Sequence, residues 1–244
     1  MELYLDTANV EQIRQAAQLG IISGVTTNPS LMAKEKGADF KATIQQICRI
    51  VQGPMSAEVL SLEPGAMVEE AQRIATWSPF VVVKVPITAA GLEVMRRLTA
   101  TYVDAARICD GCAHQADCPT GVEGARTIVE DMPIPTNATL CFSTNQGLLV
   151  AAAGATYVSP FVGRLDDIGQ DGMAMVAELV EVYQAYEIPT RVIAASIRHP
   201  LHITQAALAG ADIATVPYDV LMKALQHPLT DIGVQRFLAD WGKR

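Results

Sequence analysis

The sequence predicts an α/β protein whose parallel strands close into a (β/α)8 TIM barrel. Eight short apolar runs recur along the 244 residues, and the stretches between them carry apolar residues at helical spacing. The runs are almost continuously apolar, as expected for strands that are covered on both faces. No low-complexity linker divides the chain. We therefore expect one barrel domain over residues 1–244, with an insertion at roughly 99–122.

The expected strands follow one another at the spacing of strand–helix units. In chain order they are 3–6, 24–28, 55–59, 81–86, 134–142, 155–162, 190–196 and 213–217. The first helical stretch begins after a candidate cap, Asn9, and ends at Gly20, and another is clear at 172–186. The connection between the fourth and fifth strands is about twice as long as its neighbours and carries two helical patterns, 90–108 and 122–132. A last helical pattern covers 234–244.

Composition and charge narrow the class of protein. Half of the residues are hydrophobic and 18% are charged, so the chain can bury a large core. The net charge of −8 argues against a nucleic-acid partner, although a few arginines suffice to hold a small anion. No apolar run reaches the roughly 18 residues that span a membrane, and the start of the chain lacks a signal-peptide pattern. We expect a cytoplasmic protein whose five cysteines are thiols.

One lysine lies within an apolar run, where burial of its charge would be unfavourable. Lys84 lies in the middle of the apolar run FVVVKVPIT, at 80–88. A lysine is almost never fully buried without a partner. Apolar surroundings favour its neutral amine, which can attack a ketone and form an imine, and nearby carboxylates oppose this effect. The lysine is therefore a candidate nucleophile.

Polar residues gather near the carboxyl ends of the expected strands. They are Asp6, Thr26, Asn28, Glu58, Lys84, Asn137, Thr139, Ser159, Arg164, Ser196 and Arg198. Each alone could simply end a strand in water, but in a barrel these ends share one mouth, where active sites form. Two carboxylates suit proton transfer, whereas two arginines and a serine hydroxyl suit a phosphate group.

Several segments resemble the transaldolase family, most closely its short-chain branch, which includes the fructose-6-phosphate aldolases. They are LYLDTANVEQI at 3–13, GVTTNPSLM at 24–32, VVVKVPIT at 81–88, GLLVAAAGATYVSPFVGRLDD at 147–167 and VIAASIRHP at 192–200. The resemblance covers almost the whole chain except roughly 99–122. It implies a (β/α)8 barrel of the class I type, with no cofactor in the chemistry, that serves carbohydrate metabolism in the pentose phosphate pathway.

The resemblance also implies a role for each matching residue. Lys84 would form the Schiff base and Asp6 would be the acid and base at the C4 hydroxyl of a ketose. Glu58 and Thr139 would hold a catalytic water. The substrate-binding set would be Thr26, Asn28, Asn137, Ser159 and Phe161 around the dihydroxyacetone unit, with Arg164, Ser196 and Arg198 at the phosphate.

Three of these positions favour transfer over simple cleavage. The aldolase branch has Gln, Tyr and an aliphatic residue where this chain has Glu58, Phe161 and Asn137. A tyrosine could position water to release the three-carbon enamine, whereas a phenyl ring cannot. We expect a transaldolase that moves a dihydroxyacetone unit from fructose 6-phosphate or sedoheptulose 7-phosphate to an aldose phosphate. The alternatives are an aldolase that releases dihydroxyacetone, transfer to an unusual acceptor, and a non-catalytic sugar-phosphate-binding barrel.

The insertion carries a compact group of candidate metal ligands. Cys109, Cys112, His114 and Cys118 suit a structural zinc ion, and the other interpretation is a solvated loop with reduced thiols. The insertion fits either late in the helix after Lys84, away from the mouth, or over the mouth. The other two cysteines, Cys48 and Cys141, are interpreted as small apolar residues.

Two further features concern partners and histidines. The apolar residues Val234, Phe237, Leu238 and Trp241 lie on one side of the last helical pattern, which could pack on its own barrel. In the resembling branch the last helix packs on a neighbouring subunit, which implies a homo-oligomer here, a pentamer or a decamer. The histidines His199, His202 and His227 show no metal-ligand spacing and are interpreted as surface or supporting groups.

Overall fold

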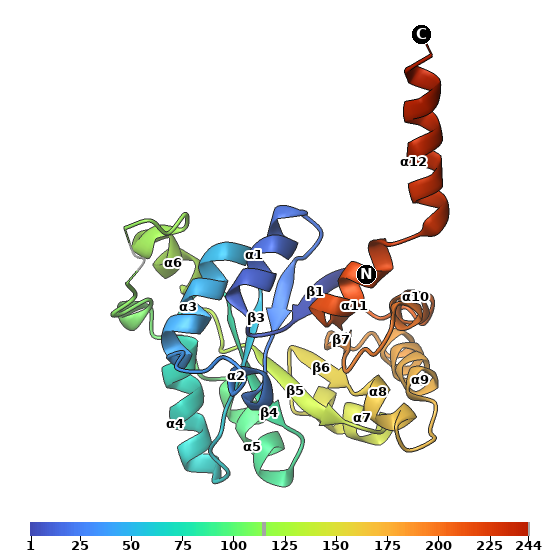
Figure 1. Cartoon of the computed structure of the whole chain (residues 1–244). Coiled ribbons are helices and arrows are strands. Elements are labelled where there is room, and N and C mark those ends of the chain that lie inside the picture. The colour runs from blue at the N-terminus through green and yellow to red at the C-terminus, as the bar shows by residue number, and fades with distance from the viewer. Residues whose placement is uncertain (114–115, 244) are drawn as a thin grey trace.

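The computed structural model describes residues 1–113 and 116–243 and confirms the barrel (Figure 1). Parallel strands pair in chain order and the last pairs with the first, so the sheet closes. The strands are β1 Glu2–Asp6, β2 Gly24–Thr26, β3 Met55–Glu58, β4 Val81–Pro86, β5 Thr136–Cys141, β6 Tyr157–Pro160, β7 Arg191–Ala194 and β8 Ile213–Val216. Each lies within, or one residue beyond, the run that predicted it.

Helices follow the strands and surround the barrel (Figure 1). They are α1 Val10–Gln18, α2 Pro29–Met32, α3 Phe40–Val51, α4 Pro64–Ala75, α5 Ala89–Leu98, the 3-10 turn η1 Ala105–Arg107, α6 Gly121–Val129, α7 Thr144–Ala152, α8 Val162–Asp166, α9 Gly172–Ala185, α10 Pro200–Leu208, α11 Tyr218–Leu225 and α12 Pro228–Trp241. The expected cap of the first helix is present, because the Asn9 side chain accepts a hydrogen bond from Gln12 N.

The register of the strands sets the positions of the polar residues at the mouth. Asp6 pairs with Thr26 across β1 and β2, and Glu58 pairs with Lys84 across β3 and β4. Lys84 is in turn the neighbour of Asn137 on β5. Barrel closure therefore brings residues that are far apart in sequence onto one interior surface.

The longer of the two helices predicted after β4 is shorter than expected. The pattern at 90–108 predicted one helix, but α5 ends at Leu98 and is followed by a loop with the single turn η1. Thr99, Thr101 and Val103 are β-branched, which lowers helix propensity, and Ile134 N donates to Thr101 O at 2.9 Å. The chain thus leaves the helical conformation after Leu98, and the hydrogen bond between Ile134 and Thr101 joins the two ends of a long connection to β5.

This excursion, residues 99–135, joins the end of α5 to the start of β5. Both of its ends therefore lie at the amino-terminal ends of the strands, opposite the mouth. Cys109 N donates to Thr76 O just after α4, and Lys41 Nζ on α3 donates to Asp110 O. The excursion thus packs on α3 and the end of α4.

The last helix, α12, stands away from the barrel in Figure 1. None of its residues, all of which the structure describes, is buried, and Phe237 is 77% exposed. The interpretation in which this helix packs on its own barrel is therefore wrong for this chain in isolation. Within the described residues, no helix combines the length and the apolar character that a membrane span requires.

Candidate active site

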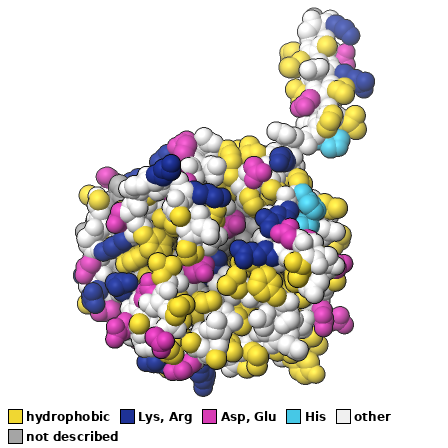
Figure 2. Space-filling model, turned by 60° about the horizontal axis from the view of Figure 1, so that its bottom comes forward, with side chains coloured by type: hydrophobic (Ala, Val, Ile, Leu, Met, Phe, Trp, Pro, Cys, Tyr) yellow, Lys and Arg dark blue, Asp and Glu magenta, His cyan; other side chains and the backbone are white. Residues whose placement is uncertain are grey.

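A cavity of about 250 Å³ opens at the carboxyl ends of the strands. Figure 2 shows lysine and arginine side chains gathered around a hollow on this face, with acidic side chains among them. Nine of the residues predicted for the site line the cavity: Asp6, Thr26, Asn28, Lys84, Ser159, Phe161, Arg164, Ser196 and Arg198. The remaining three predicted residues are Glu58, Asn137 and Thr139, which lie on the strands beside it.

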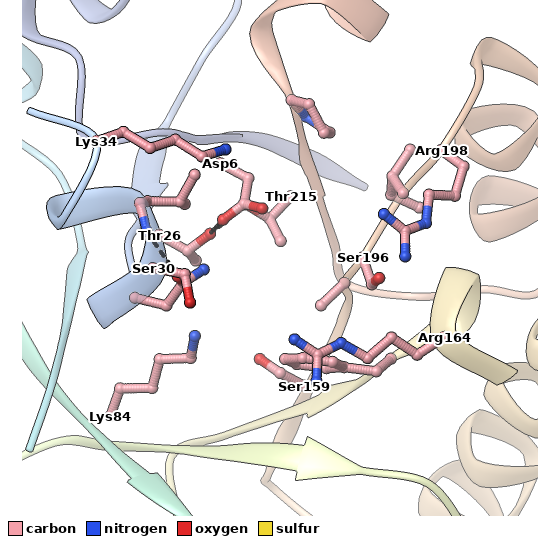
Figure 3. Close-up of a pocket in the computed structure, with 16 residues that line it drawn as sticks. Asp6, Thr26, Ser30, Lys34, Lys84, Ser159, Arg164, Ser196, Arg198 and Thr215 are labelled. Atoms are coloured by element: carbon pink, nitrogen blue, oxygen red, sulfur yellow. Dashed lines mark hydrogen bonds between the residues drawn. The ribbon is translucent and has the colours of Figure 1, made fainter. Parts of the chain in front are cut away.

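Strand alternation explains why a lysine occupies an apolar run. Val81, Val83 and Val85 pack in the main core that includes residues of the surrounding helices. Val82 belongs instead to a small cluster inside the barrel, with Tyr4 and other residues. Because side chains alternate along a strand, Lys84 points inward like Val82 but one step nearer the mouth. Figure 3 shows its amine directed into the cavity.

The amine of Lys84 is buried but has polar partners. Only 4% of the residue is exposed. Its Nζ lies 3.2 Å from Glu58 Oε2 and donates to the backbone oxygen of Thr27 at 3.1 Å. The carboxylate offsets part of the cost of burying a charge, and it also stands where it can accept a proton from the amine.

Asp6 is a second carboxylate near the amine, held by hydroxyl groups. Thr26 Oγ1 donates to Asp6 Oδ1 at 2.8 Å and lies 2.6 Å from Thr215 Oγ1. Burial raises the pKa of Asp6, while Lys84, the Thr26 hydrogen bond and Lys34 act in the opposite direction. Figure 3 shows the end of the Lys34 side chain beside Asp6. Burial and the nearby cations thus have opposite effects on the pKa of Asp6, and burial is the larger of them.

Amide and hydroxyl groups complete the floor of the site. Asn137 is fully buried, accepts from Ser159 Oγ at 2.8 Å and donates to Ser56 Oγ at 3.0 Å. Thr139 Oγ1 is buried and has no hydrogen-bond partner within the described residues. An unpaired buried hydroxyl is costly, so this oxygen is suited to bind a small polar group.

A further amide stands at the start of α2. Asn28 caps this short helix, and its side-chain oxygen accepts from Leu31 N at 3.0 Å. Because an amide oxygen has two lone pairs, it can accept a second hydrogen bond, and the amide nitrogen can donate to a ligand in the cavity.

Two arginines lie together on the side of the cavity opposite Asp6 and Lys34. Figure 3 shows Arg164, Ser196 and Arg198 across from Asp6 and Lys34. Arg164 stacks over the ring of Phe161, with 5.1 Å from its guanidinium carbon to the ring centroid. Two guanidinium groups and a hydroxyl in one place can bind an anion such as phosphate.

Sequence reasoning missed several residues that line the cavity. They are Ser30, Leu31, Lys34, Ala195, Ile197, Thr215 and Pro217. Thr215 is on β8 and was hidden inside an expected strand, where position alone gave no sign of function. The approach of Lys34 to Asp6 depends on how α2 folds back over the mouth, which no local pattern indicates.

The cysteines of the excursion lie elsewhere. Cys109, Cys112 and Cys118 line a small pocket together with Cys48 of α3, which packs in the hydrophobic core as expected. Within residues 1–113 and 116–243 no three His, Cys, Asp or Glu side chains are placed to hold a metal ion. His114 lies outside the described residues. None of the described residues of the excursion lines the active-site cavity.

We predict that Lys34→Met raises the pKa of Asp6, because it removes a positive charge that stabilises the carboxylate. The carbon-13 signal of the Asp6 carboxyl group, followed by NMR against pH, measures this. Lys36→Met is the control, since Lys36 is exposed and does not line the cavity. An Asp6 titration that stays in place or moves to lower pH in Lys34→Met would contradict the proposed contact.

Comparison with known proteins agrees with this geometry. The family model described as "Transaldolase/Fructose-6-phosphate aldolase" matches residues 3–243. A "Probable transaldolase" of Roseiflexus castenholzii is 54% identical over 99% of this chain and 97% of its own length. Proteins of the same description are 50% identical in Dehalococcoides mccartyi, over 99% and 98% of the two chains, and 48% identical in Methanococcus vannielii, over 99% and 97%. The chain therefore belongs to the transaldolase/fructose-6-phosphate aldolase family.

Proposed function

We propose that this protein is a Schiff-base transaldolase that transfers a dihydroxyacetone unit from a ketose phosphate to an aldose phosphate. The observation that carries the proposal is the buried amine of Lys84, which points into the cavity beside Glu58. Donors would be fructose 6-phosphate or sedoheptulose 7-phosphate. The proposal is also supported by the two carboxylates near this amine and by a cationic rim, which consists of Arg164 and Arg198. The carboxylates and the amine suit the covalent step, and the rim suits recognition of a phosphorylated sugar.

In the first half of the reaction Lys84 passes a proton to Glu58 and its neutral nitrogen attacks C2 of fructose 6-phosphate. Loss of the C2 oxygen as water gives an iminium ion. Asp6 then takes the proton of the C4 hydroxyl, the C3–C4 bond breaks, and its electrons flow into the iminium to give an enamine. Glyceraldehyde 3-phosphate leaves with the new aldehyde carbon.

The second half reverses these steps on a different aldehyde. The enamine carbon C3 attacks the aldehyde carbon of erythrose 4-phosphate, and the protonated Asp6 returns its proton to the new hydroxyl. Water then adds to C2 of the iminium and releases sedoheptulose 7-phosphate and free Lys84. The unpaired hydroxyl of Thr139 and the nearby carboxylate of Glu58 support a role in placing that water. The amides Asn28 and Asn137 would hold the dihydroxyacetone hydroxyls.

The alternative is an aldolase that releases free dihydroxyacetone. Phe161 faces the reacting amine, with Lys84 Nζ 5.9 Å from the ring centroid. A phenyl ring offers no hydroxyl that could position water to protonate the enamine, so the enamine persists until an acceptor arrives. The ring therefore favours transfer, and an acceptor other than erythrose 4-phosphate fits the same argument.

We predict that borohydride reduction in the presence of fructose 6-phosphate traps a covalent adduct on Lys84, because hydride adds to C2 of the iminium ion. Lys84→Ala should give no adduct, whereas Lys34→Ala, which removes another lysine of the cavity, should still give one. Intact-protein and peptide mass spectrometry measure the trapping. Equal trapping in wild type and Lys84→Ala would reject the Schiff base at this position, and no trapping in wild type would favour a non-catalytic barrel.

We predict that wild-type protein converts fructose 6-phosphate only when erythrose 4-phosphate is present. Phe161→Tyr should raise release of dihydroxyacetone without acceptor by about tenfold or more, because a hydroxyl near the enamine can assist its protonation. An assay for free dihydroxyacetone measures this. Phe142→Tyr is the matched control, since this ring packs against Phe161 at 5.8 Å but does not line the cavity. Rapid acceptor-free turnover by the wild type would support the aldolase instead.

We further propose that the chain forms a homo-oligomer, a pentamer or a decamer, through α12. The helix exposes Phe237, Leu238 and Trp241 at 77%, 67% and 69%. Sedimentation velocity should show a species of five or ten chains of 26.1 kDa, and Phe237→Asp should shift it to smaller species. Tyr186→Asp, at a residue 77% exposed at the end of α9, is the control. A monomeric wild type would contradict the proposal.

We also propose a structural zinc ion held by Cys109, Cys112, Cys118 and His114, the set that the sequence indicates. Cys109, Cys112 and Cys118 line one pocket with Cys48, but they are not placed around a common point in the described structure, so the metal would have to draw them together. Burial and the neighbouring thiols raise the pKa of Cys109 to about 11, so a metal would be needed to hold this group as a thiolate.

We predict about one zinc ion per chain in protein prepared without chelator, measured by elemental mass spectrometry. Cys112→Ser should lose the metal but still form the imine, because the excursion lies outside the active-site cavity. Cys141→Ser, which alters a buried thiol on β5, should keep the metal. Absence of zinc from the wild type, or loss of imine formation in folded Cys112→Ser, would refute this role.

A further inference from the structure

A buried histidine joins the two segments that carry the arginines of the cationic rim. Arg198 N lies 3.3 Å from His202 Nδ1, and His202 Nε2 lies 3.1 Å from Asp166 Oδ2. Arg198 is in the loop after β7, whereas Asp166 ends α8, the short helix that carries Arg164. One imidazole ring, in the first turn of α10, thus contacts both segments.

The two contacts define the chemical form of the ring. A backbone N–H can only donate, so Nδ1 of His202 must accept and carries no proton. The proton is then on Nε2, which donates to the carboxylate of Asp166. The imidazole is neutral in one tautomer, and a second proton would set two donors against each other at Arg198 N.

The surroundings of His202 favour the same neutral form. The residue is 5% exposed, and its ring lies 3.8 Å, centroid to centroid, from the ring of His199. Burial lowers the pKa of His202, and His199 and Arg198 add to this effect, whereas Asp166 opposes it. The amino-terminal turn of a helix also disfavours a cation.

Further contacts hold the two arginine-bearing segments in place. The other oxygen of Asp166 accepts from Gly172 N at 3.0 Å, which anchors the end of α8 to the start of α9. Gly163 N donates to Ser196 O at 3.0 Å, and a Cβ at Gly163 would lie 2.6 Å from Arg198 side-chain atoms. The arginine-bearing segments therefore touch directly, and small movements of either would change the spacing of their guanidinium groups.

The Arg198 guanidinium has a separate partner. Its Nη2 donates to Asp167 Oδ2 at 2.8 Å, and both side chains are largely exposed. This ion pair orients the tip of the side chain, but it does not replace the backbone contact to His202. The position of the Arg198 main chain and the direction of its side chain thus depend on different groups.

We propose that His202 is a positioning residue that sets the spacing of Arg164 and Arg198 and thereby the affinity of the site for phosphate. The proposal rests on the proposed function, in which these arginines bind the phosphate of the sugar. His202 itself does not line the cavity and would touch no substrate.

Three substitutions separate the two contacts of the ring. The side-chain oxygen of His202→Asn can stand at the place of Nδ1 and accept from Arg198 N, but it does not reach Asp166. His202→Gln can place its amide nitrogen near Asp166 but offers no acceptor at Nδ1. His202→Leu removes both. His227→Leu is the matched control, because His227 Nδ1 also accepts from a backbone N–H, that of Leu229, far from the cavity.

The test measures the dissociation constant of inorganic phosphate by calorimetry, together with KM and kcat for fructose 6-phosphate. We expect His202→Leu to raise the dissociation constant and KM about three- to tenfold, as for loss of one or two buried hydrogen bonds, with kcat within about twofold of wild type. His202→Gln should lose nearly as much and His202→Asn clearly less. His227→Leu should match wild type.

Other patterns overturn the proposal. An unchanged phosphate affinity in His202→Leu, or equal losses in the Asn and Gln variants, would show that the contact to Arg198 does not set the site. A fall in kcat with an unchanged KM for fructose 6-phosphate would also overturn the proposal. Borohydride trapping with unphosphorylated dihydroxyacetone tests the Schiff-base function separately from the role of His202. No trapping in wild type would reject the imine chemistry. Phosphate calorimetry tests the role of His202 whether or not the imine forms.

Discussion

The site depends on one costly arrangement, an amine buried inside the barrel and paired with the carboxylate of Glu58. Strand alternation turns Lys84 inward on β4, and the register of β3 with β4 places Glu58 directly beside it. Removing a charge from water costs several kcal/mol, and the ion pair and the Thr27 carbonyl return part of that cost. In the proposed Schiff-base mechanism the same carboxylate takes the proton of the amine, so the group that stabilises the buried charge would also serve the chemistry.

Charged side chains lie on both sides of the mouth. The carboxyl group of Asp6 and the amine of Lys84 lie on one side, and the guanidinium groups of Arg164 and Arg198 lie on the other (Figure 3). A chain with a net charge of −8 can thus present a local cationic rim to a phosphorylated sugar. Behind the rim, His202 contacts both arginine-bearing segments without lining the cavity, and this arrangement is the basis of the positioning role proposed for it.

The features that extend the barrel lie away from its mouth. The excursion between α5 and β5 starts and ends at the opposite end of the strands, and α12 projects from the side of the molecule. Barrels build chemistry from the loops at the carboxyl ends of strands and tolerate change elsewhere. Metal binding or assembly can therefore be acquired at these places without moving the residues around Lys84.

The eight strands and their closure into a barrel could be predicted from the sequence, as could nine of the residues that line the cavity. Apolar runs and polar residues near strand ends are local signals, and they indicated Lys84, Asp6 and the two arginines as candidates. Three other relations became visible in the folded chain alone: Lys34 approaches Asp6, Cys48 lies beside the cysteines of the excursion, and His202 links two arginine-bearing segments. These relations join residues from different strand–helix units. They arise from barrel closure and from how helices and loops pack, which local patterns do not encode.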